Sequence, residues 1–369
     1  YNIYSNPKDS RFNDPEFFQT HLAQQIAQHG TNSIQAANAA YKLGQVLDQL
    51  RRYREAEKMY RKTVSIFETH HGKNFSTTLD ARVCLGFSLA AQPEKQKRVE
   101  AVSVLRENIA RSTASCGATD LATAKQSKYL AAILSSQEKF DEAETLFEST
   151  LKIQRKILGD NDLRTLDTME QLIFLKERSD NMEEAILLYR LLLARRRELC
   201  GTNNDLSVLK IRGKLGCALV HHHKFAEGEQ MLRSCHAAYA SHYPELNNSA
   251  TVDVQEHLAT ALLCQHKDAE GTRWLLHALN AQLKCDPPRI SSLDAMAEGL
   301  RDLAKQLRER GMVKKGNVLQ RTVVSSLEAG LGHSHPSTLT AKLSFGQALV
   351  DQGRFSEALG PLQNARNSL

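Results

Sequence analysis

The sequence contains few aromatic residues and no long hydrophobic run. Aromatics make up 6% of the 369 residues, with a single Trp, which is little for an all-β protein. No apolar segment reaches the ~20 residues that span a bilayer. Residues 1–20 also lack the basic-then-apolar pattern of a signal peptide. We therefore expect no membrane insertion.

Cysteine pairs and catalytic motifs are also missing. The seven cysteines are odd in number and form no CxxC pair, which favours reduced thiols in the cytoplasm. The motifs GxxxxGK[ST], HExxH and GxSxG do not occur. The run His221, His222, His223 is interpreted as a helix end and turn, since consecutive helical residues point in different directions. We expect no enzyme activity, no metal and no cofactor.

Charge of one sign is not concentrated anywhere. The net charge is +6 and the pI about 8.9, but Lys and Arg alternate with acids along the chain. Nucleic-acid binding usually needs a concentrated basic stripe, so we expect no nucleic-acid partner. The length exceeds that of one ordinary compact domain unless the chain is a repeat array. Because it begins at Tyr1, we expect a shortened or processed form of a longer product.

What is present is a repeat, seen in three markers that keep one register. A glycine recurs at Gly30, Gly72, Gly117, Gly159 and Gly201, with spacings of 42, 45, 42 and 42, and resumes at Gly332. A small residue, mostly beside acids, recurs at Ala56, Ala101, Ala143, Ala185, Gly228, Gly271, Gly316 and Ala358. A large apolar anchor, usually followed by a small residue, recurs at Leu43, Leu85, Leu130, Leu172, Leu215, Leu258, Leu303 and Phe345. Such regularity indicates repeating structural units.

Each repeat predicts two helices. In residues 122–158, apolar and small residues follow helical spacing in two segments that meet near residue 138. Gly159 then ends the second helix in the left-handed cap conformation, and the Asp and Asn residues after it cap the next helix. The segments LGDNDLRTL (158–166) and LGHSHPSTL (331–339) therefore encode a helix end, a turn and a helix start. Small residues after each anchor allow the two helices to approach closely.

These residues carry a resemblance to a known family. The pattern L-(G/A) on the first helix and F/Y-x-E-A-E on the second resembles the tetratricopeptide repeat. The period of 42 and the ending LGxxHPxTL resemble the kinesin-light-chain type, which also occurs in fungal repeat proteins and at the C-termini of NOD-like receptors. The best-matching segment is LGHSHPSTLTAKLSFGQALVDQGRFSEAL. HEAT-like pairs have a similar length but lack this register.

The resemblance covers residues 34–369 and implies an all-α, right-handed superhelical solenoid of antiparallel helix pairs. We expect an N-terminal segment (1–33), whose residues 15–30 form the second helix of an incomplete pair, followed by eight pairs. Their approximate bounds are 34–75, 76–120, 121–162, 163–204, 205–247, 248–290, 291–335 and 336–369.

The resemblance also implies a partner-binding groove lined by the first helices. Its positions lie five, two and one residues before each anchor and two, five and six after it. In the second pair these are the mainly apolar Val83, Cys84 and Phe87; acids occur at Asp167, Glu170, Asp253 and Glu256. The candidate partner-binding residues are Asn38, Tyr41, Lys42, Gln45, Lys125, Lys128, Tyr129, Gln171, Phe174, Lys210, Lys214, His257, Arg301 and Lys305.

Two interpretations of this groove stay open. Its charges alternate by pair, so basic and acidic side chains of neighbouring first helices, such as Lys128 and Glu170, can pair with each other. Alternatively, the groove binds an acidic or mixed-charge peptide, with Tyr129 and Phe174 holding an apolar side chain. We expect a non-enzymatic cytoplasmic scaffold or adaptor for a protein or peptide.

Three other functions are kept as alternatives. The chain could be the sensing C-terminal region of a larger NOD-like signalling protein. It could be a solenoid recruited as an enzyme, with Glu170 or Glu256 near His257. It could also be a structural scaffold that self-associates through its end helices.

Overall fold

The computed structural model describes residues 14–243, 249–285 and 289–366, and in these residues it contains seventeen helices and no strand. The predicted all-α array of antiparallel helix pairs is therefore confirmed. The chain divides into two compact units between Asn181 and Met182, within the predicted pair 163–204. Residues 1–13 of the predicted N-terminal segment lie outside the described residues, and the eight-pair division of the sequence stays a prediction.

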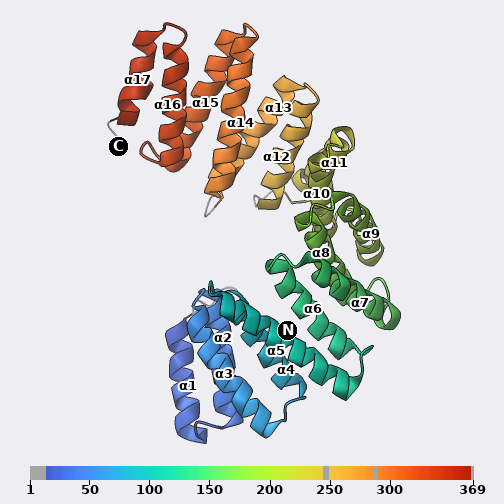
Figure 1. Cartoon of the computed structure of the whole chain (residues 1–369). Coiled ribbons are helices and arrows are strands. Elements are labelled where there is room, and N and C mark those ends of the chain that lie inside the picture. Colours follow the sequence, from blue (N-terminus) through green and yellow to red (C-terminus); the bar gives the residue numbers. More distant parts are fainter. Residues whose placement is uncertain (1–13, 244–248, 286–288, 367–369) are drawn as a thin grey trace. The chain divides into compact units, whose positions relative to one another are not determined.

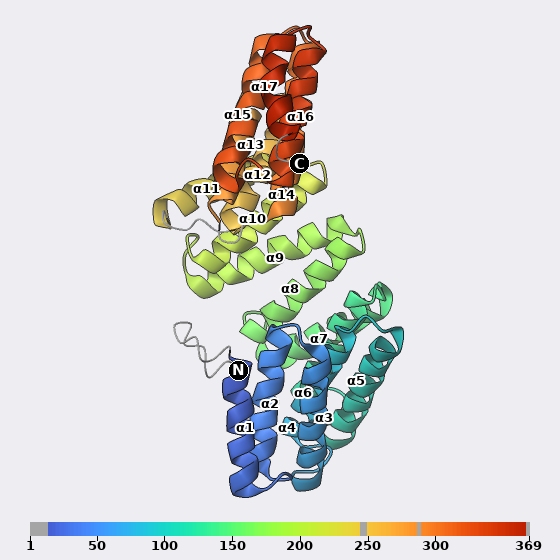
Figure 2. The same cartoon turned by 90° about the vertical axis from the view of Figure 1, so that its left-hand side faces the viewer.

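In its described residues, 14–181, the N-terminal unit contains eight helices, and each packs against the next (Figure 1). Figure 2 shows its first three helices side by side. The first helix, expected over 15–30, is followed by Gly30 as predicted. The helices are α1 (Pro15–His29), α2 (Ile34–Gln49), α3 (Tyr53–His70), α4 (Ser76–Ala90), α5 (Lys95–Cys116), α6 (Leu121–Ser136), α7 (Phe140–Leu158) and α8 (Leu163–Arg178).

The C-terminal unit continues the same alternation of first and second helices. Its core is formed by anchors such as Leu258 and Leu303, which are almost fully buried. All seven cysteines of the chain are described and free. The helices are α9 (Met182–Cys200), α10 (Leu206–His221), α11 (Phe225–His242), α12 (Ser249–Cys264), α13 (Asp268–Leu283), α14 (Ile290–Glu309), α15 (Val313–Leu331), α16 (Pro336–Val350) and α17 (Phe355–Arg366).

The turn after the second helix α7 explains why Gly159 and Thr165 occur together in LGDNDLRTL. Gly159 has φ 87° and ψ 170°, so its φ is positive as predicted, but its ψ is extended instead of left-handed helical. Only glycine adopts this region readily. Six residues later, the Thr165 hydroxyl donates to the Gly159 carbonyl at 2.9 Å, and Asp162 caps α8 by accepting from the Arg164 amide. The same Thr–Gly bond recurs at Thr78–Gly72 and Thr123–Gly117.

Small residues allow the two helices of a pair to approach, as expected. A β-carbon on Gly216 would lie 2.6 Å from Leu232 Cδ2, and one on Gly316 would lie 2.5 Å from the carbonyl oxygen of Ala304. Neither distance is tolerated by real side chains. Glycine at these positions therefore sets the spacing between first and second helices.

Glu57, which follows the small residue Ala56 on α3, links its own helix pair to the next one. The Glu57 carboxylate accepts from Gln92 at 2.8 Å and from Lys97 at 2.7 Å, and also from Arg61 on its own helix at 2.9 Å. Gln92 and Lys97 belong to the next helix pair. The same arrangement recurs at Glu229, with Gln265, Lys267 and Arg233.

Candidate partner-binding surface

The sequence-predicted positions on the first helices are solvent-accessible; we call them the first-helix face. Val83 is the exception, because it is 5% exposed and belongs to the core, so its expected place in the groove was wrong. Exposed members are Asn38, Gln45, Lys125, Gln171, Phe174, Lys210, Lys214 and Lys305. Half-buried members are Tyr41, Lys42, Lys128, Tyr129, His257 and Arg301.

In the N-terminal unit the basic groups of this face are neutralised. Lys125 on α6 pairs with Asp80 on α4 at 2.7 Å, and Lys128 pairs with Asp167 on α8 at 2.8 Å. Pairing between neighbouring first helices, one of the two interpretations of the sequence, is therefore present. Asp80 was missed by the sequence analysis although it lies five residues before the anchor Leu85, where the spacing rule would have found it.

Aromatic side chains give the same face an apolar character. The rings of Tyr129 and Phe87 meet edge to face at 5.8 Å, and the Lys128 ammonium lies 5.7 Å from the Tyr129 ring. Phe174 on α8 is 54% exposed, with the Arg178 guanidinium 5.9 Å from its ring. Amphipathic surfaces of this kind accept an apolar side chain of a partner.

Tyr41 and Cys84 join α2 to α4. The Tyr41 hydroxyl lies 3.2 Å from Cys84 Sγ, and its ring packs edge to face against Tyr60 at 5.8 Å. Burial raises the pKa of the Cys84 thiol to about 11. The thiolate is the reactive form, so Cys84 acts as a packing residue and not as a nucleophile at neutral pH.

In the C-terminal unit the basic groups of the face are not neutralised. No acidic partner within 4 Å is found, among the described residues, for the four cations Lys210 and Lys214 on α10 and Arg301 and Lys305 on α14. The acids of α12 are already engaged, because Asp253 pairs with Arg289 at 2.5 Å and Glu256 accepts from Ser292 at 3.2 Å. Lys210 and Lys214 on α10 therefore carry positive charge that is not neutralised, whereas Arg301 and Lys305 alternate with the exposed acids Glu298 and Asp302 on α14.

His257 faces His221 across α12 and α10. The two Nε2 atoms lie 3.0 Å apart, and His257 Nδ1 lies 2.7 Å from the carbonyl oxygen of Asp253. Since a carbonyl only accepts, His257 donates through Nδ1, and in its neutral form its Nε2 accepts from His221. Burial and the neighbouring His257 lower the pKa of His221. His221 lies six residues after Leu215, a face position that the sequence analysis assigned to a turn.

This geometry bears on the acid–histidine alternative. Both nitrogens of His257 are occupied by groups other than Glu256, and burial raises the pKa of the Glu256 carboxyl.

The two histidines that follow His221 have other surroundings. His222 lies 3.4 Å from Glu183, and His223 occupies a positive-φ turn position. Across the described ranges, no three His, Cys, Asp or Glu side chains are arranged to hold a metal ion.

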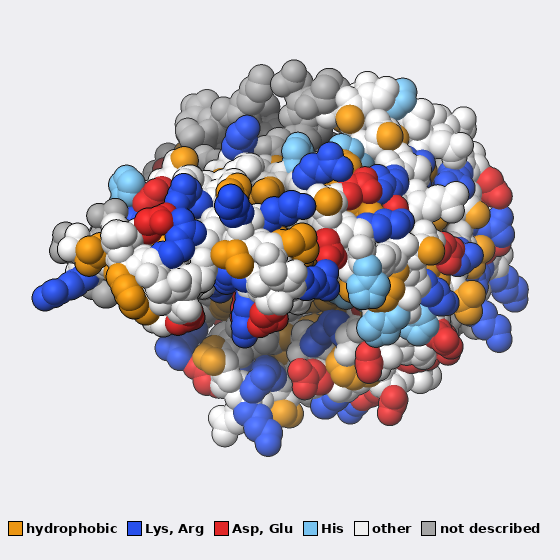
Figure 3. All heavy atoms as spheres, turned by 90° about the horizontal axis from the view of Figure 1, so that it is seen from above, with side chains coloured by type: hydrophobic (Ala, Val, Ile, Leu, Met, Phe, Trp, Pro, Cys, Tyr) orange, Lys and Arg blue, Asp and Glu red, His pale blue; other side chains and the backbone are white. Residues whose placement is uncertain are grey.

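Charges are mixed over the surface. Figure 3 shows a face of the molecule on which basic and acidic side chains are intermixed, with hydrophobic side chains in small separate patches. Among the described helices, none combines the length and the apolar composition needed to cross a membrane.

Comparisons with known proteins agree on the repeat. A tetratricopeptide repeat family model matches residues 16–69 and 122–198. No curated protein matched the sequence. Among solved structures, the chain is similar to kinesin light chain TPR-like repeats from Podosopora anserina, with 18% identity, 57% of this chain and 97% of that chain covered, and a TM-score of 0.50.

Two further structures match almost the whole chain. One is a Signal Transduction ATPase with Numerous Domains (STAND) protein with a tetratricopeptide repeat sensor from Pyrococcus horikoshii, with 12% identity, 98% of this chain and 53% of that chain covered, and a TM-score of 0.56. The other is the quorum sensor NprR from B. thuringiensis, with 10% identity, coverages of 96% and 97%, and a TM-score of 0.51. At these identities the likenesses show the fold alone, and this chain spans about half the length of the STAND protein.

Proposed function

We propose that this chain, which carries tetratricopeptide repeats, is a non-enzymatic scaffold that holds an acidic protein or peptide segment on the first-helix face of its C-terminal unit. The proposal extends the general role of such repeats in protein–protein interaction. One observation carries it: Lys210, Lys214, Arg301 and Lys305 have no acidic partner among the described residues, whereas Lys125 and Lys128 do.

The charge distribution supports an acidic partner. Lys210 and Lys214 are four residues apart, so they lie on the same side of α10 and present two ammonium groups together. A carboxylate brought to them gains an ion pair without breaking an existing one, whereas at Lys125 it would have to displace Asp80. Uncompensated basic groups also speed the encounter with an acidic partner.

The N-terminal unit has a different role in this proposal. Its neutral aromatic positions Phe87, Tyr129 and Phe174 receive apolar side chains of the partner. Since His257 has no acidic partner on its ring nitrogens, we propose no reaction. Because its seven cysteines are free, we propose that the scaffold is cytoplasmic. Light scattering, which measures the molecular mass in solution, would test self-association through the end helices.

The likeness to the STAND protein favours a second proposal. It extends over 98% of this chain, and that protein's tetratricopeptide repeats are described as a sensor. We infer that this chain serves as the sensing part of a larger signalling protein. The test is to express the larger protein that contains this chain and to measure its activity with and without the partner. An activity that does not change when the partner is added would contradict this proposal.

A pull-down from native lysate tests the scaffold proposal. The wild-type chain is compared with Lys210→Glu/Lys214→Glu and with a matched control, Lys152→Glu/Lys156→Glu, which makes the same charge change at the same spacing on α7. Both control lysines are exposed. Circular dichroism verifies that all three chains are equally helical.

The groove variant and the control variants have opposite expected outcomes. Proteins bound by the wild type and the control should be lost from Lys210→Glu/Lys214→Glu, and their binding should weaken with added salt. Lys125→Gln/Lys128→Gln should retain them, because those lysines are already paired. Retention of the same proteins by Lys210→Glu/Lys214→Glu would contradict the proposal.

A further inference from the structure

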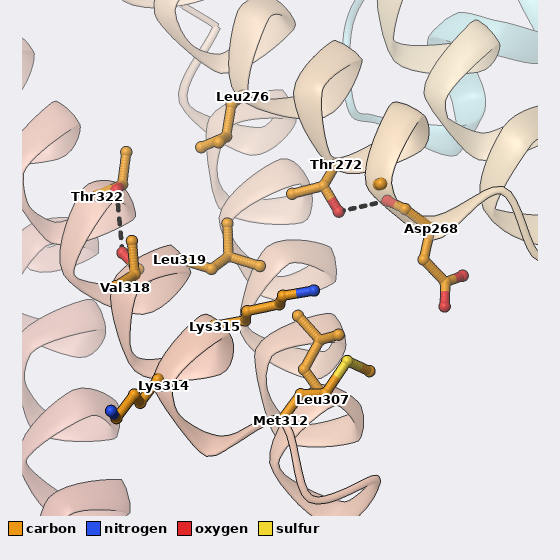
Figure 4. Close-up of a pocket in the computed structure, with 11 residues that line it drawn as sticks. Asp268, Thr272, Leu276, Leu307, Met312, Lys314, Lys315, Val318, Leu319 and Thr322 are labelled. Carbon is orange, nitrogen blue, oxygen red and sulfur yellow. Dashed lines mark hydrogen bonds between the residues drawn. The ribbon is translucent and has the colours of Figure 1, made fainter.

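A pocket lies on the second-helix side of the C-terminal unit, away from the first-helix face. It occupies about 510 Å³ between α13 and α15 and is closed at one side by the end of α14. Its apolar lining comes from Leu276, Leu307, Met312, Val318 and Leu319 (Figure 4). Pockets that bind ligands commonly have volumes of about 300–1,000 Å³.

The packing of α13 and α15 explains why this pocket exists. At their C-terminal ends the two helices touch, since a β-carbon on Gly330 would lie 2.6 Å from Leu283 Cδ2. The pocket is lined by their N-terminal halves, from Asp268 to Leu276 and from Lys314 to Thr322. Close contact at one end with separation at the other leaves a wedge that the side chains do not fill.

The two threonine hydroxyls and the carboxylate around the pocket already have hydrogen-bond partners. The Thr272 hydroxyl donates to the Asp268 carbonyl at 2.6 Å, and the Thr322 hydroxyl donates to the Val318 carbonyl at 2.9 Å. The Asp268 carboxylate accepts from Arg310 at 2.6 Å. Among the lining side chains only Lys314 and Lys315 remain as donors, so a sugar or a nucleobase would lose most of its hydrogen bonds to water here, which is costly. The pocket therefore suits an apolar group.

Two lysines lie at the mouth of this pocket. Lys314 and Lys315 line it, and among the described residues neither has an acidic partner within 4 Å. Figure 4 shows Lys315 extending across the pocket towards α13, whereas Lys314 points away at its rim. The single carboxylate, that of Asp268, is neutralised by Arg310. A ligand that enters with an apolar group and carries carboxylates beside it complements this arrangement.

We propose that the pocket is a second docking site, which takes a large apolar side chain of an acidic peptide segment. A peptide fits better than a free acyl chain because the rim is open to water: Val318 is 64% exposed, and both lysines are exposed. An acyl chain would leave much of its length in contact with water, whereas a peptide inserts one side chain and keeps its backbone solvated. The site is independent of the first-helix face and of the function proposed for it.

Fluorescence anisotropy with two labelled peptides tests this proposal on the full chain. Both peptides carry Leu and Phe at helical spacing; the remaining positions are Glu in the acidic probe and Lys in the basic probe. The variants are Lys315→Glu and Val318→Glu, both at exposed positions. Matched controls are Lys156→Glu on α7 and Val99→Glu on α5, of which Val99 is 60% exposed. Circular dichroism checks the folding of each variant.

The wild type and both controls should bind the acidic probe, and each pocket variant should weaken it by at least about tenfold. Lys315→Glu should also improve binding of the basic probe. Absence of acidic-probe binding, or equal binding by the pocket variants, would overturn the proposal. Palmitate that displaces the acidic probe and binds more tightly would overturn the choice of a peptide. Because the acidic probe can also bind the first-helix face, the pocket variants are measured again in the Lys210→Glu/Lys214→Glu background, where a further loss of probe binding of about tenfold is assigned to the pocket alone.

Discussion

Replacing Glu57 by Gln tests whether the acid of the repeat motif joins neighbouring helix pairs. The side chain is 11% exposed and accepts hydrogen bonds from Arg61, Gln92 and Lys97. Gln has almost the same shape but no charge, so the substitution removes the charge-assisted character of these bonds and leaves the packing in place. The effect should therefore report the electrostatic link between α3 and the following pair.

The magnitude follows from the pKa of Glu57. Burial alone would raise it, but hydrogen bonds from Lys97, Gln92 and Arg61 lower it from 4.5 to about 2. At ~1.36 kcal/mol per pKa unit, this bounds the stabilisation at roughly 3 kcal/mol. Lys97 and Arg61 both keep Glu100 as a partner after the substitution. We therefore expect a loss of ~2 kcal/mol in the free energy of unfolding.

The sign of the pH dependence follows from the lowered pKa. The contribution is fully present above the unfolded pKa of 4.5 and is lost as the pH falls towards the folded value of about 2. The stability difference between wild type and Glu57→Gln should thus shrink between pH 5 and pH 2, in which range the wild-type carboxylate becomes protonated.

Hydrogen exchange with mass spectrometry measures the effect locally. At neutral pH, amides of α3 and α4 should exchange roughly 30-fold faster in Glu57→Gln. Urea unfolding at several pH values measures the pH dependence. Glu55→Gln is the control, since Glu55 is 48% exposed and pairs with Arg52, the N-cap residue of the same helix; it should change little. A cost below about 0.5 kcal/mol for Glu57→Gln, or one that does not vary with pH, would refute this reasoning.

Three further predictions concern single residues. Thr165→Val removes the hydrogen bond to Gly159 and should cost about 1 kcal/mol in urea unfolding, whereas Thr165→Ser should retain it. Glu138 has φ 63° in the turn between α6 and α7, so Glu138→Gly should raise the melting temperature through a gain of up to about 1 kcal/mol; a decrease would show that side-chain contacts matter more. Cys84, with its pKa raised to about 11, should react with iodoacetamide at pH 8 far more slowly than the exposed Cys116, and equal rates would contradict its burial.

Much of the fold could be predicted because its signals are local. The second helix of 122–158 was expected to end at Gly159, and α7 ends at Leu158. Asp162 caps the next helix as expected, and the conformation of Gly159 differs from the prediction only in its ψ. Such features depend on a few consecutive residues, whose spacing and backbone preferences the sequence displays directly.

The candidate site was only partly predictable. The spacing rule placed Lys125 and Lys128 on an accessible face, but it gave the partner of Lys128 as Glu170, whereas the structure pairs it with Asp167. Val83, at an equivalent position, is buried. Asp167 and Glu170 lie about one helical turn apart on α8. Which of them reaches Lys128 depends on how one helix pair is rotated relative to the next, and this rotation does not follow from the period of the repeat.

The class of fold, the turns and the small residues that let helices pack could be predicted from the residues alone. Which basic groups are neutralised, the contact between His257 and His221, and the pocket between α13 and α15 became known from the three-dimensional arrangement. The reason is physical. Helix periodicity and turn conformation are properties of neighbouring residues, whereas the angle between helix pairs is set by close contacts between distant ones. Gly330 against Leu283 is such a contact, and it fixes the wedge in which the pocket lies.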